Sequence, residues 1–126
     1  MNNWHKGIVI SGNKLGSAIG FPTLNIKNPE ILEGEKLGVY AALVKIKNKI
    51  YQAVLFFGPR LILHEKKNVL EIFVFDFDEE IYNQPVSFKL IKYIRPALNF
   101  QDMKSYKKQL ADDTTKARAI LTRFPK

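Results

Sequence analysis

Apolar and polar residues alternate along most of the chain up to residue 94. Apolar, often β-branched residues recur at every second position in short segments, as expected of strands with one buried face. The pattern predicts strands at residues 5–10, 38–46, 50–57, 69–77 and 86–94, with a tight turn at 47–49 and a strand break at Gly58-Pro59. Many short strands separated by turns are typical of a β-sandwich or a β-barrel.

The period changes near the C-terminus. Beyond Asp102, a plausible N-cap, the apolar residues fall mostly at three- and four-residue steps: Met103, Tyr106, Leu110, Ala117 and Leu121. Lysines lie off this stripe, at positions 104, 107, 108 and 116. The spacing predicts an amphipathic helix that lies on the sheet with a solvated basic back.

Composition limits the kind of protein. A chain of 126 residues with 46% hydrophobic and 25% charged residues fits one globular domain, residues 1–126. Cysteine is absent, and His5 and His64 are too few for a zinc site. There is no run of the length of a membrane span and no signal-peptide core, so we expect a cytoplasmic protein without a membrane partner.

The net charge of +8 has three interpretations. It is a solvated surface, an attraction for a polyanionic substrate, or a nucleic-acid interface. The lysines are scattered along the chain, and the phenylalanines occur in apolar strands rather than interleaved with basic residues. We therefore expect no nucleic-acid partner.

A glycine-rich segment carries the first chemical signal. Gly12, Gly16 and Gly20 precede Phe21-Pro22, which leads to Thr23 and Asn25. Free N–H groups of such a loop can surround an anion. In an extended chain Thr23 and Asn25 point the same way, with oxygens suited to a hard cation. The segment predicts a site for a nucleotide polyphosphate and magnesium; the alternative is ordinary turn chemistry.

Glu71 is the second signal. It is the only charge between Val69 and Phe75, and alternation places it on one strand face with Phe73, Phe75 and Phe77. Loss of hydration there raises the pKa of a carboxylate and makes it a better general base near neutral pH. The alternatives are an inward glutamate paired with a basic residue, or a strand-end residue exposed to water.

The chain resembles the riboflavin kinase (flavokinase) family. The ordered blocks that carry the resemblance are Pro22-Thr23-Leu24-Asn25, Gly38-Val39-Tyr40, the strand around Glu71 with Ile81-Tyr82, and Ile94-Arg95 with Phe100. The resemblance implies a six-stranded antiparallel Greek-key barrel with a C-terminal helix. It also implies transfer of the γ-phosphate of ATP to the 5′-hydroxyl of riboflavin, giving FMN and ADP with Mg2+.

The resemblance also assigns roles to residues. Glu71 falls where the family places its catalytic base, and Thr23 and Asn25 where it holds magnesium and the phosphates. The phosphate-binding set is Gly12, Lys14, Gly16, Gly20, Thr23 and Asn25, although Gly20 also suits a simple bend. Arg95 and Phe73 are candidates for flavin contact; the alternatives are a surface arginine and a core ring.

Three departures from the family pattern lie near the expected site. Lys14-Leu15 replaces an Arg-Gly pair, Leu24 replaces alanine, and residues 58–62 lack the usual Pro-Thr-Phe stretch. They motivate an alternative, a catalytically impaired flavin- or nucleotide-binding module of the same fold. Nothing resembles the His-x-Gly-His signature of the adenylyltransferase domain, so we expect a monomer or a domain cut from a bifunctional FAD synthetase.

Overall fold

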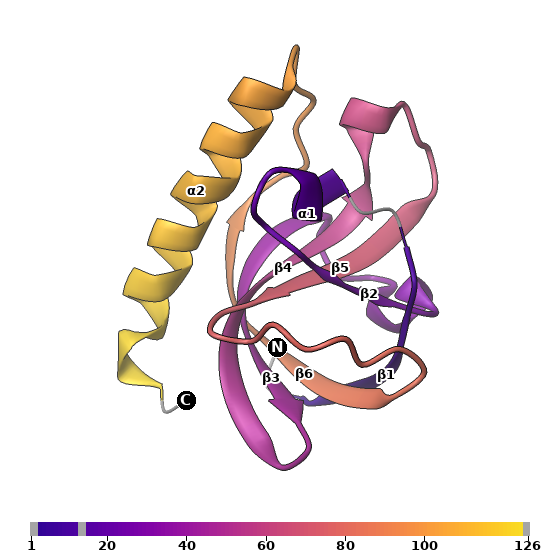
Figure 1. The fold of residues 1–126 in the computed structure, drawn as a ribbon, viewed down its shortest axis with the longest axis vertical. Helices are drawn as coiled ribbons and strands as arrows, with labels where there is room; N and C mark the ends of the chain where they lie inside the picture. The colour runs from indigo at the N-terminus through magenta and orange to yellow at the C-terminus, as the bar shows by residue number, and fades with distance from the viewer. Residues whose placement is uncertain (1–2, 13–14, 125–126) are drawn as a thin grey trace.

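Six antiparallel strands close into a barrel, and one long helix lies along its outside (Figure 1). The structure is a computed structural model that describes residues 3–12 and 15–124. The strands are β1 (His5–Ile10), β2 (Leu24–Ile26), β3 (Gly38–Ile46), β4 (Lys49–Pro59), β5 (Asn68–Val74) and β6 (Pro85–Arg95). The helices are α1 (Leu15–Ala18) and α2 (Met103–Ile120), with short 3-10 helices η1 (Pro29–Leu32), η2 (Leu61–Leu63) and η3 (Leu121–Arg123).

The order of the strands around the barrel is β1-β2-β5-β4-β3-β6. β3, β4 and β5 follow one another as a meander, and β6 returns to pair with β3. That arrangement is a Greek key. The predicted fold, a six-stranded antiparallel Greek-key barrel with a C-terminal helix, is confirmed.

Two predicted strand ends were wrong. β4 continues through Gly58 and Pro59, which pair with Val69 and Asn68 of β5; Pro59 is tolerated because it is the last residue of its strand. β5 ends at Val74, and Asp76 then adopts a left-handed φ of 60°. Phe77 therefore leaves the face that alternation assigned to it, and its ring packs edge-on against Tyr51.

Strand β2 was not predicted, because three residues carry too little pattern. Asn25 pairs with Ile10 of β1 on one side and with Glu71 of β5 on the other. Tertiary pairing on both edges thus fixes the extended conformation of Leu24–Ile26. This short strand brings the glycine-rich segment beside the strand that carries Glu71.

The two faces of β5 pack into different apolar layers. Leu70, Ile72 and Val74 belong to the barrel interior, whereas Phe73 belongs to a second layer between the barrel and α2. Glu71 has the same parity as Phe73, so its carboxylate lies on the outer side of the barrel wall. The site is thereby confined to the seam between barrel and helix.

Helix α2 begins where the sequence predicts. The Asp102 side chain accepts a hydrogen bond from the Ser105 amide at 2.8 Å, the contact of an N-cap. Ala117 and Leu121 of the stripe are fully buried, whereas Met103 remains 37% exposed. Within the described part of the chain, none of the helices has the length and apolar character needed to cross a bilayer.

Candidate active site

Thr23 and Glu71, which lie 48 residues apart in the chain, meet through a side-chain hydrogen bond. The pairing of β2 with β5 sets Leu24 opposite Ile72 and Asn25 opposite Glu71. Thr23 Oγ1 then donates to Glu71 Oε1 at 3.2 Å. The structure therefore joins the two principal residues that the sequence proposed separately.

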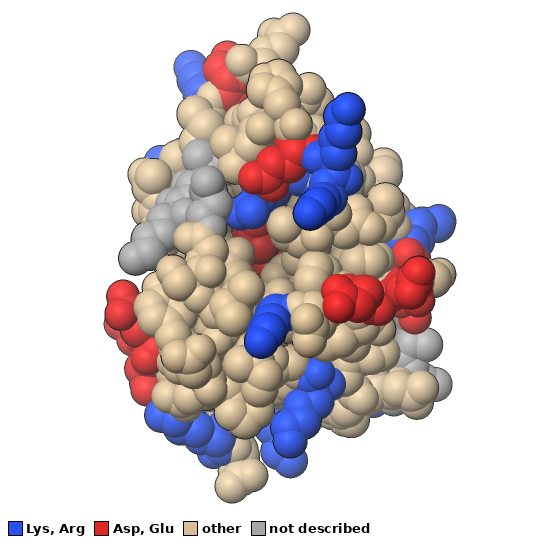
Figure 2. Space-filling model, turned by 90° about the vertical axis from the view of Figure 1, so that its right-hand side faces the viewer, with Lys and Arg blue, Asp and Glu red and all other residues tan. Residues whose placement is uncertain are grey.

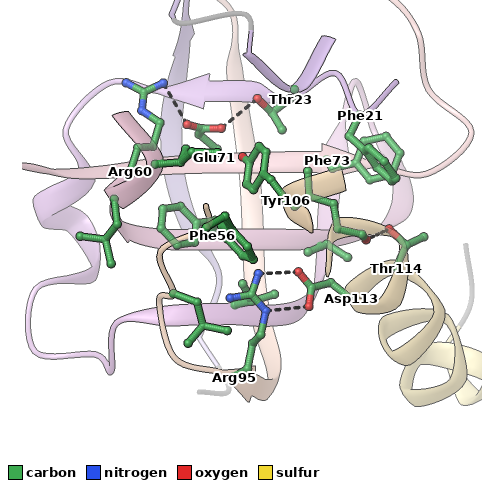
Figure 3. Close-up of a pocket in the computed structure, with 18 of the residues that line it drawn as sticks. Phe21, Thr23, Phe56, Arg60, Glu71, Phe73, Arg95, Tyr106, Asp113 and Thr114 are labelled. Carbon is green, nitrogen blue, oxygen red and sulfur yellow. Dashed lines mark hydrogen bonds and ion pairs between the residues drawn. The ribbon is translucent and has the colours of Figure 1, made fainter. Parts of the chain in front are cut away.

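Arg60 approaches the other oxygen of the same carboxylate. Its Nη1 lies 3.1 Å from Glu71 Oε2, and its Nε donates to Glu65 Oε1 at 2.9 Å. Figure 3 shows Glu71 between Arg60 on one side and Thr23 on the other. The pairing with a basic residue, one of the sequence alternatives, is thus present, although Glu71 points into the seam with α2 and not into the barrel. Both oxygens of Glu71 have a polar neighbour.

Burial dominates the electrostatics of Glu71, which is 9% exposed. Loss of hydration raises its pKa, while the Arg60 charge and the Thr23 hydrogen bond lower it; the Glu65 charge raises it again. The net direction is upward. A raised pKa is what general-base catalysis near neutral pH requires of a carboxylate.

An apolar cavity of about 70 Å³ extends from Glu71 between the barrel and α2. Its wall is largely aromatic and aliphatic and includes Phe21, Val54, Phe56, Phe73, Leu98, Phe100, Tyr106 and Leu110. Tyr106 stands close to Glu71: burial, followed by the Glu71 charge, raises the pKa of its phenol to about 12. The sequence left two interpretations of Phe73, a flavin contact or a core ring. The ring packs in the second apolar layer and also lines this cavity.

Arg95 closes the side of this cavity opposite Glu71 (Figure 3). Its Nε and Nη2 donate to the two carboxylate oxygens of Asp113, at 2.8 and 2.7 Å. Asp113 on α2 is fully buried. The Arg95 side chain is only 12% exposed. It is therefore a largely buried link between β6 and α2, and the surface-arginine alternative does not describe it.

A second, more polar cavity of about 220 Å³ lies on the other side of Thr23. Thr23 borders both cavities. The second cavity is lined by Gly12, Ser17 and Asn25 from the glycine-rich segment, and by Asp78, Glu79, Glu80 and Tyr82 from the connection between β5 and β6. The arrangement offers two neighbouring compartments that meet at Thr23.

The predicted phosphate-binding glycines occupy different surroundings. Gly12 backs Asn25: a Cβ there would lie 2.4 Å from Asn25 Cγ. Gly16 borders the apolar cavity instead, and a Cβ would lie 2.2 Å from the Phe21 carbonyl oxygen. Gly20 has a φ of 90° and open space around it, which fits the bend. Lys14 lies outside the described residues.

Thr23 and Asn25 can supply only some of the ligands that a cation needs. Among the described residues, no group of three or more His, Cys, Asp or Glu side chains could hold a metal. Thr23 and Asn25 offer neutral oxygens, which suit a magnesium ion that keeps waters and takes most of its ligands from phosphates. The donor set fits a metal that arrives with a nucleotide.

Sequence reasoning assigned no site role to Arg60, Tyr106 or Asp113. Asp113 carried a signal, because it lies on the apolar stripe of α2, three residues after Leu110 and four before Ala117. Arg60 carried none: it lies after the strand break that the sequence predicted wrongly. Only the pairing of β4 with β5 brings it beside Glu71.

On one face of the molecule the charged side chains are scattered (Figure 2). Figure 2 shows one face on which basic side chains occur singly or in small groups, with acidic side chains among them. An acidic side chain also lies at the bottom of a recess on this face. The net charge of +8 is therefore not gathered into one patch here.

The chain is similar to known riboflavin kinases. The family described as riboflavin kinase matches residues 2–121. A bifunctional riboflavin kinase/FMN adenylyltransferase of Haemophilus influenzae is 38% identical over 115 residues, which cover 90% of this chain and 37% of that protein. An RNA-binding riboflavin kinase of Bacillus subtilis is 31% identical over 108 residues, or 85% of this chain and 46% of the relative.

A solved structure supports the fold. The riboflavin kinase from Trypanosoma brucei superposes with a TM-score of 0.67 and 19% identity, over 96% of this chain and 80% of that one. This likeness concerns the fold alone. The two bacterial relatives are longer, since this chain spans less than half of either.

Proposed function

This chain belongs to the riboflavin kinase family, and we propose that it transfers the γ-phosphate of ATP to the 5′-hydroxyl of riboflavin. The observation that carries the proposal is the Thr23–Glu71 hydrogen bond at the junction of two cavities. One cavity is apolar and aromatic, and the other is polar and bordered by the glycine-rich segment. An acceptor alcohol and a phosphoryl donor can thus meet at one carboxylate.

The apolar cavity is the proposed flavin compartment. Phe56, Phe73 and Tyr106 supply flat surfaces for an isoalloxazine ring, and Arg95 supplies hydrogen-bond donors at the rim. The ribityl chain would lead its 5′-hydroxyl to Glu71. The cavity volume of about 70 Å³ is smaller than the roughly 300 Å³ typical of small-molecule sites. We therefore expect the segment before α2, which contributes Leu98 and Phe100 to the cavity wall, to move when the flavin enters.

The second cavity is the proposed nucleotide compartment. Gly12 leaves room for the side chain of Asn25, and Thr23 and Asn25 would hold a magnesium ion together with phosphate oxygens. Bound magnesium would neutralise the phosphate charge during transfer. Asp78, Glu79 and Glu80 add negative charge to this compartment, which favours a metal-complexed nucleotide over a free one.

Glu71 is the proposed general base. Its raised pKa and its position at the apolar cavity suit acceptance of the hydroxyl proton as the alcohol attacks. Phosphoryl transfer depends chiefly on alignment and charge stabilisation. We therefore expect Thr23, Asn25 and the loop amides to contribute to the rate by aligning the phosphates and stabilising their charge, in addition to proton transfer to Glu71.

The proposal is tested by incubating the protein with riboflavin, ATP and magnesium and separating the flavins by chromatography. FMN is expected with the wild type and with the exposed-site control Glu33→Gln, but not with Glu71→Gln. Riboflavin binding should survive in Glu71→Gln. Flavin binding without FMN formation by the wild type would instead indicate the impaired binding module.

We propose no nucleic-acid role for this domain, although one relative is described as RNA-binding. Basic side chains are dispersed over the face that Figure 2 shows. Aromatic rings such as Phe73 and Phe75 pack against each other in the seam rather than forming an exposed stacking platform. Oligonucleotide binding that persists near physiological salt would contradict this view.

A further inference from the structure

Arg60 is held between two carboxylates with unequal contacts. Its Nε donates a well-formed hydrogen bond to Glu65 at 2.9 Å. Its Nη1 is only 3.1 Å from Glu71 Oε2, yet within the described part of the chain neither of these two buried atoms has a hydrogen-bond partner. The contact with Glu71 is therefore one of charge without hydrogen-bond alignment.

The contact with Arg60 also occupies the base. Glu71 Oε1 already accepts from Thr23, whereas Oε2 accepts no hydrogen bond within the described part of the chain. A substrate hydroxyl that approaches Oε2 must share this buried oxygen with the Arg60 Nη1 group, 3.1 Å away, or displace it. Of the two Arg60 contacts, the one with Glu71 should break more easily than the one with Glu65. Alignment contributes much of the strength of a charge-assisted hydrogen bond, and the contact with Glu71 is not aligned.

We propose that Arg60 binds the transferring phosphoryl group of the nucleotide triphosphate, and that its guanidinium turns from Glu71 to this anion when the nucleotide binds. The inference rests on the proposed function. Arg60 lines the apolar cavity together with Thr23 and Glu71, and Thr23 also borders the polar cavity proposed for the nucleotide. Arg60 therefore lies on the flavin side of the junction across which the phosphoryl group must pass. Its hydrogen bond to Glu65 tethers it while the Nη groups turn from one anion to the other.

The chemistry of the side chain suits this role. A guanidinium is always charged and presents several donors in a plane that matches phosphate oxygens. Its side chain is only 15% exposed, so its charge is less screened by water than that of a surface arginine. Arginines placed on a transferring phosphoryl group contribute large factors to kcat in other phosphotransferases.

A binding experiment separates this role from that of a structural counter-ion. The parent is Glu71→Gln, and the test variant is Glu71→Gln/Arg60→Gln, which removes both buried charges together and so leaves neither unpaired. Affinity is measured by calorimetry with magnesium and either the β,γ-imido analogue of ATP or ADP. We expect the double variant to bind the triphosphate analogue at least tenfold more weakly and ADP within twofold of the parent.

Three further measurements sharpen the test. The exposed Arg123→Gln serves as the matched control and should leave both affinities unchanged. With Glu71 intact, Arg60→Gln should lower kcat about a hundredfold or more while KM for riboflavin changes less than about threefold. Arg60→Lys should recover part of kcat, because it restores the charge without the planar donor set.

Equal affinities of parent and double variant for the triphosphate analogue would overturn the role of Arg60, and so would an equal loss for the analogue and ADP. A parent that is folded but binds neither nucleotide would overturn the proposed function as well. The two failures are distinguishable, because only the second removes ADP binding from the parent.

Discussion

Arg95 at the end of β6 and Asp113 in the middle of α2 are joined by two parallel hydrogen bonds of 2.8 and 2.7 Å. Asp113 also accepts from Gln109 Nε2 at 3.1 Å. The pair links the helix to the barrel beside the apolar cavity. It thereby holds the part of α2 that lines the proposed flavin site against the barrel.

Loss of this pair is expected to destabilise the protein strongly. Asp113→Ala leaves the largely buried guanidinium of Arg95 without its anion, which costs about 3 kcal/mol of unfolding free energy. Urea unfolding measures the change. Asp112→Ala is the control: its ion pair with Lys116 is more than half exposed, so its removal should cost less than about 1 kcal/mol. Equal effects of the two variants would contradict the argument.

Gln52 on β4 is expected to hold the C-terminal end of α2. Its Nε2 donates to the carbonyl oxygens of Leu121 and Phe124 at 2.8 and 3.0 Å. Gln52→Leu leaves both carbonyls without this donor and should cost about 1–2 kcal/mol. Hydrogen exchange should accelerate most in residues 117–124. The exposed Gln101→Leu should leave the exchange of that segment unchanged, and a uniform acceleration over the whole chain would argue against a local cap.

The raised pKa of Glu71 predicts that the ionised carboxylate, which serves activity, lowers the stability of the folded state at neutral pH. The folded state binds this proton more tightly than the unfolded state, so Glu71 favours folding below the ordinary glutamate pKa. That contribution is lost as pH rises through the raised folded value. Arg60 keeps its hydrogen bond to Glu65 when Glu71 is replaced, so its charge is not left without a partner. We therefore expect Glu71→Gln to be inactive yet at least as stable as the wild type near pH 7.5.

Urea unfolding of both proteins between pH 4 and pH 8 checks the sign. Relative to Glu71→Gln, the wild type should gain stability as pH falls. A wild type that gains stability relative to this variant as pH rises would mean that Arg60 and Thr23 outweigh burial.

Gly12 is expected to be required for the position of Asn25. An alanine Cβ would lie 2.4 Å from Asn25 Cγ, so Gly12→Ala must displace that side chain or the loop. We expect KM for ATP to rise about tenfold, equivalent to about 1.4 kcal/mol, with KM for riboflavin nearly unchanged. The neighbouring Ser11→Ala, at an exposed position, is the control.

A double variant identifies the cause of that effect. In an Asn25→Ala background the obstructing side chain is gone, so adding Gly12→Ala should change stability and KM for ATP little. Additive losses would mean that Gly12 acts through its own backbone rather than through Asn25.

The sequence by itself determined most of the strands, typical of a β-sandwich or a β-barrel, and the C-terminal helix, because these depend on local pattern; the family resemblance supplied the choice of a six-stranded barrel. Alternation reveals strands with one buried face, and three- and four-residue spacing reveals helix α2 with its cap at Asp102. Glu71 was recognisable as a lone charge in an apolar strand, and Thr23 and Asn25 as polar residues after a glycine-rich segment. Their family order supplied the expected chemistry, whereas their roles remain predictions.

Only the tertiary structure decided which residues surround Glu71. β2 is extended because β1 and β5 pair with its two edges, and three residues carry no readable period of their own. Arg60 reaches Glu71 because β4 runs two residues beyond its predicted end at Phe57, through the predicted break, and pairs with β5 up to Pro59. Asp113 contacts Arg95 because α2 packs along the outside of the barrel, beside the end of β6. Each of these contacts depends on strand register or helix placement, which are set by packing between distant segments and not by the local sequence.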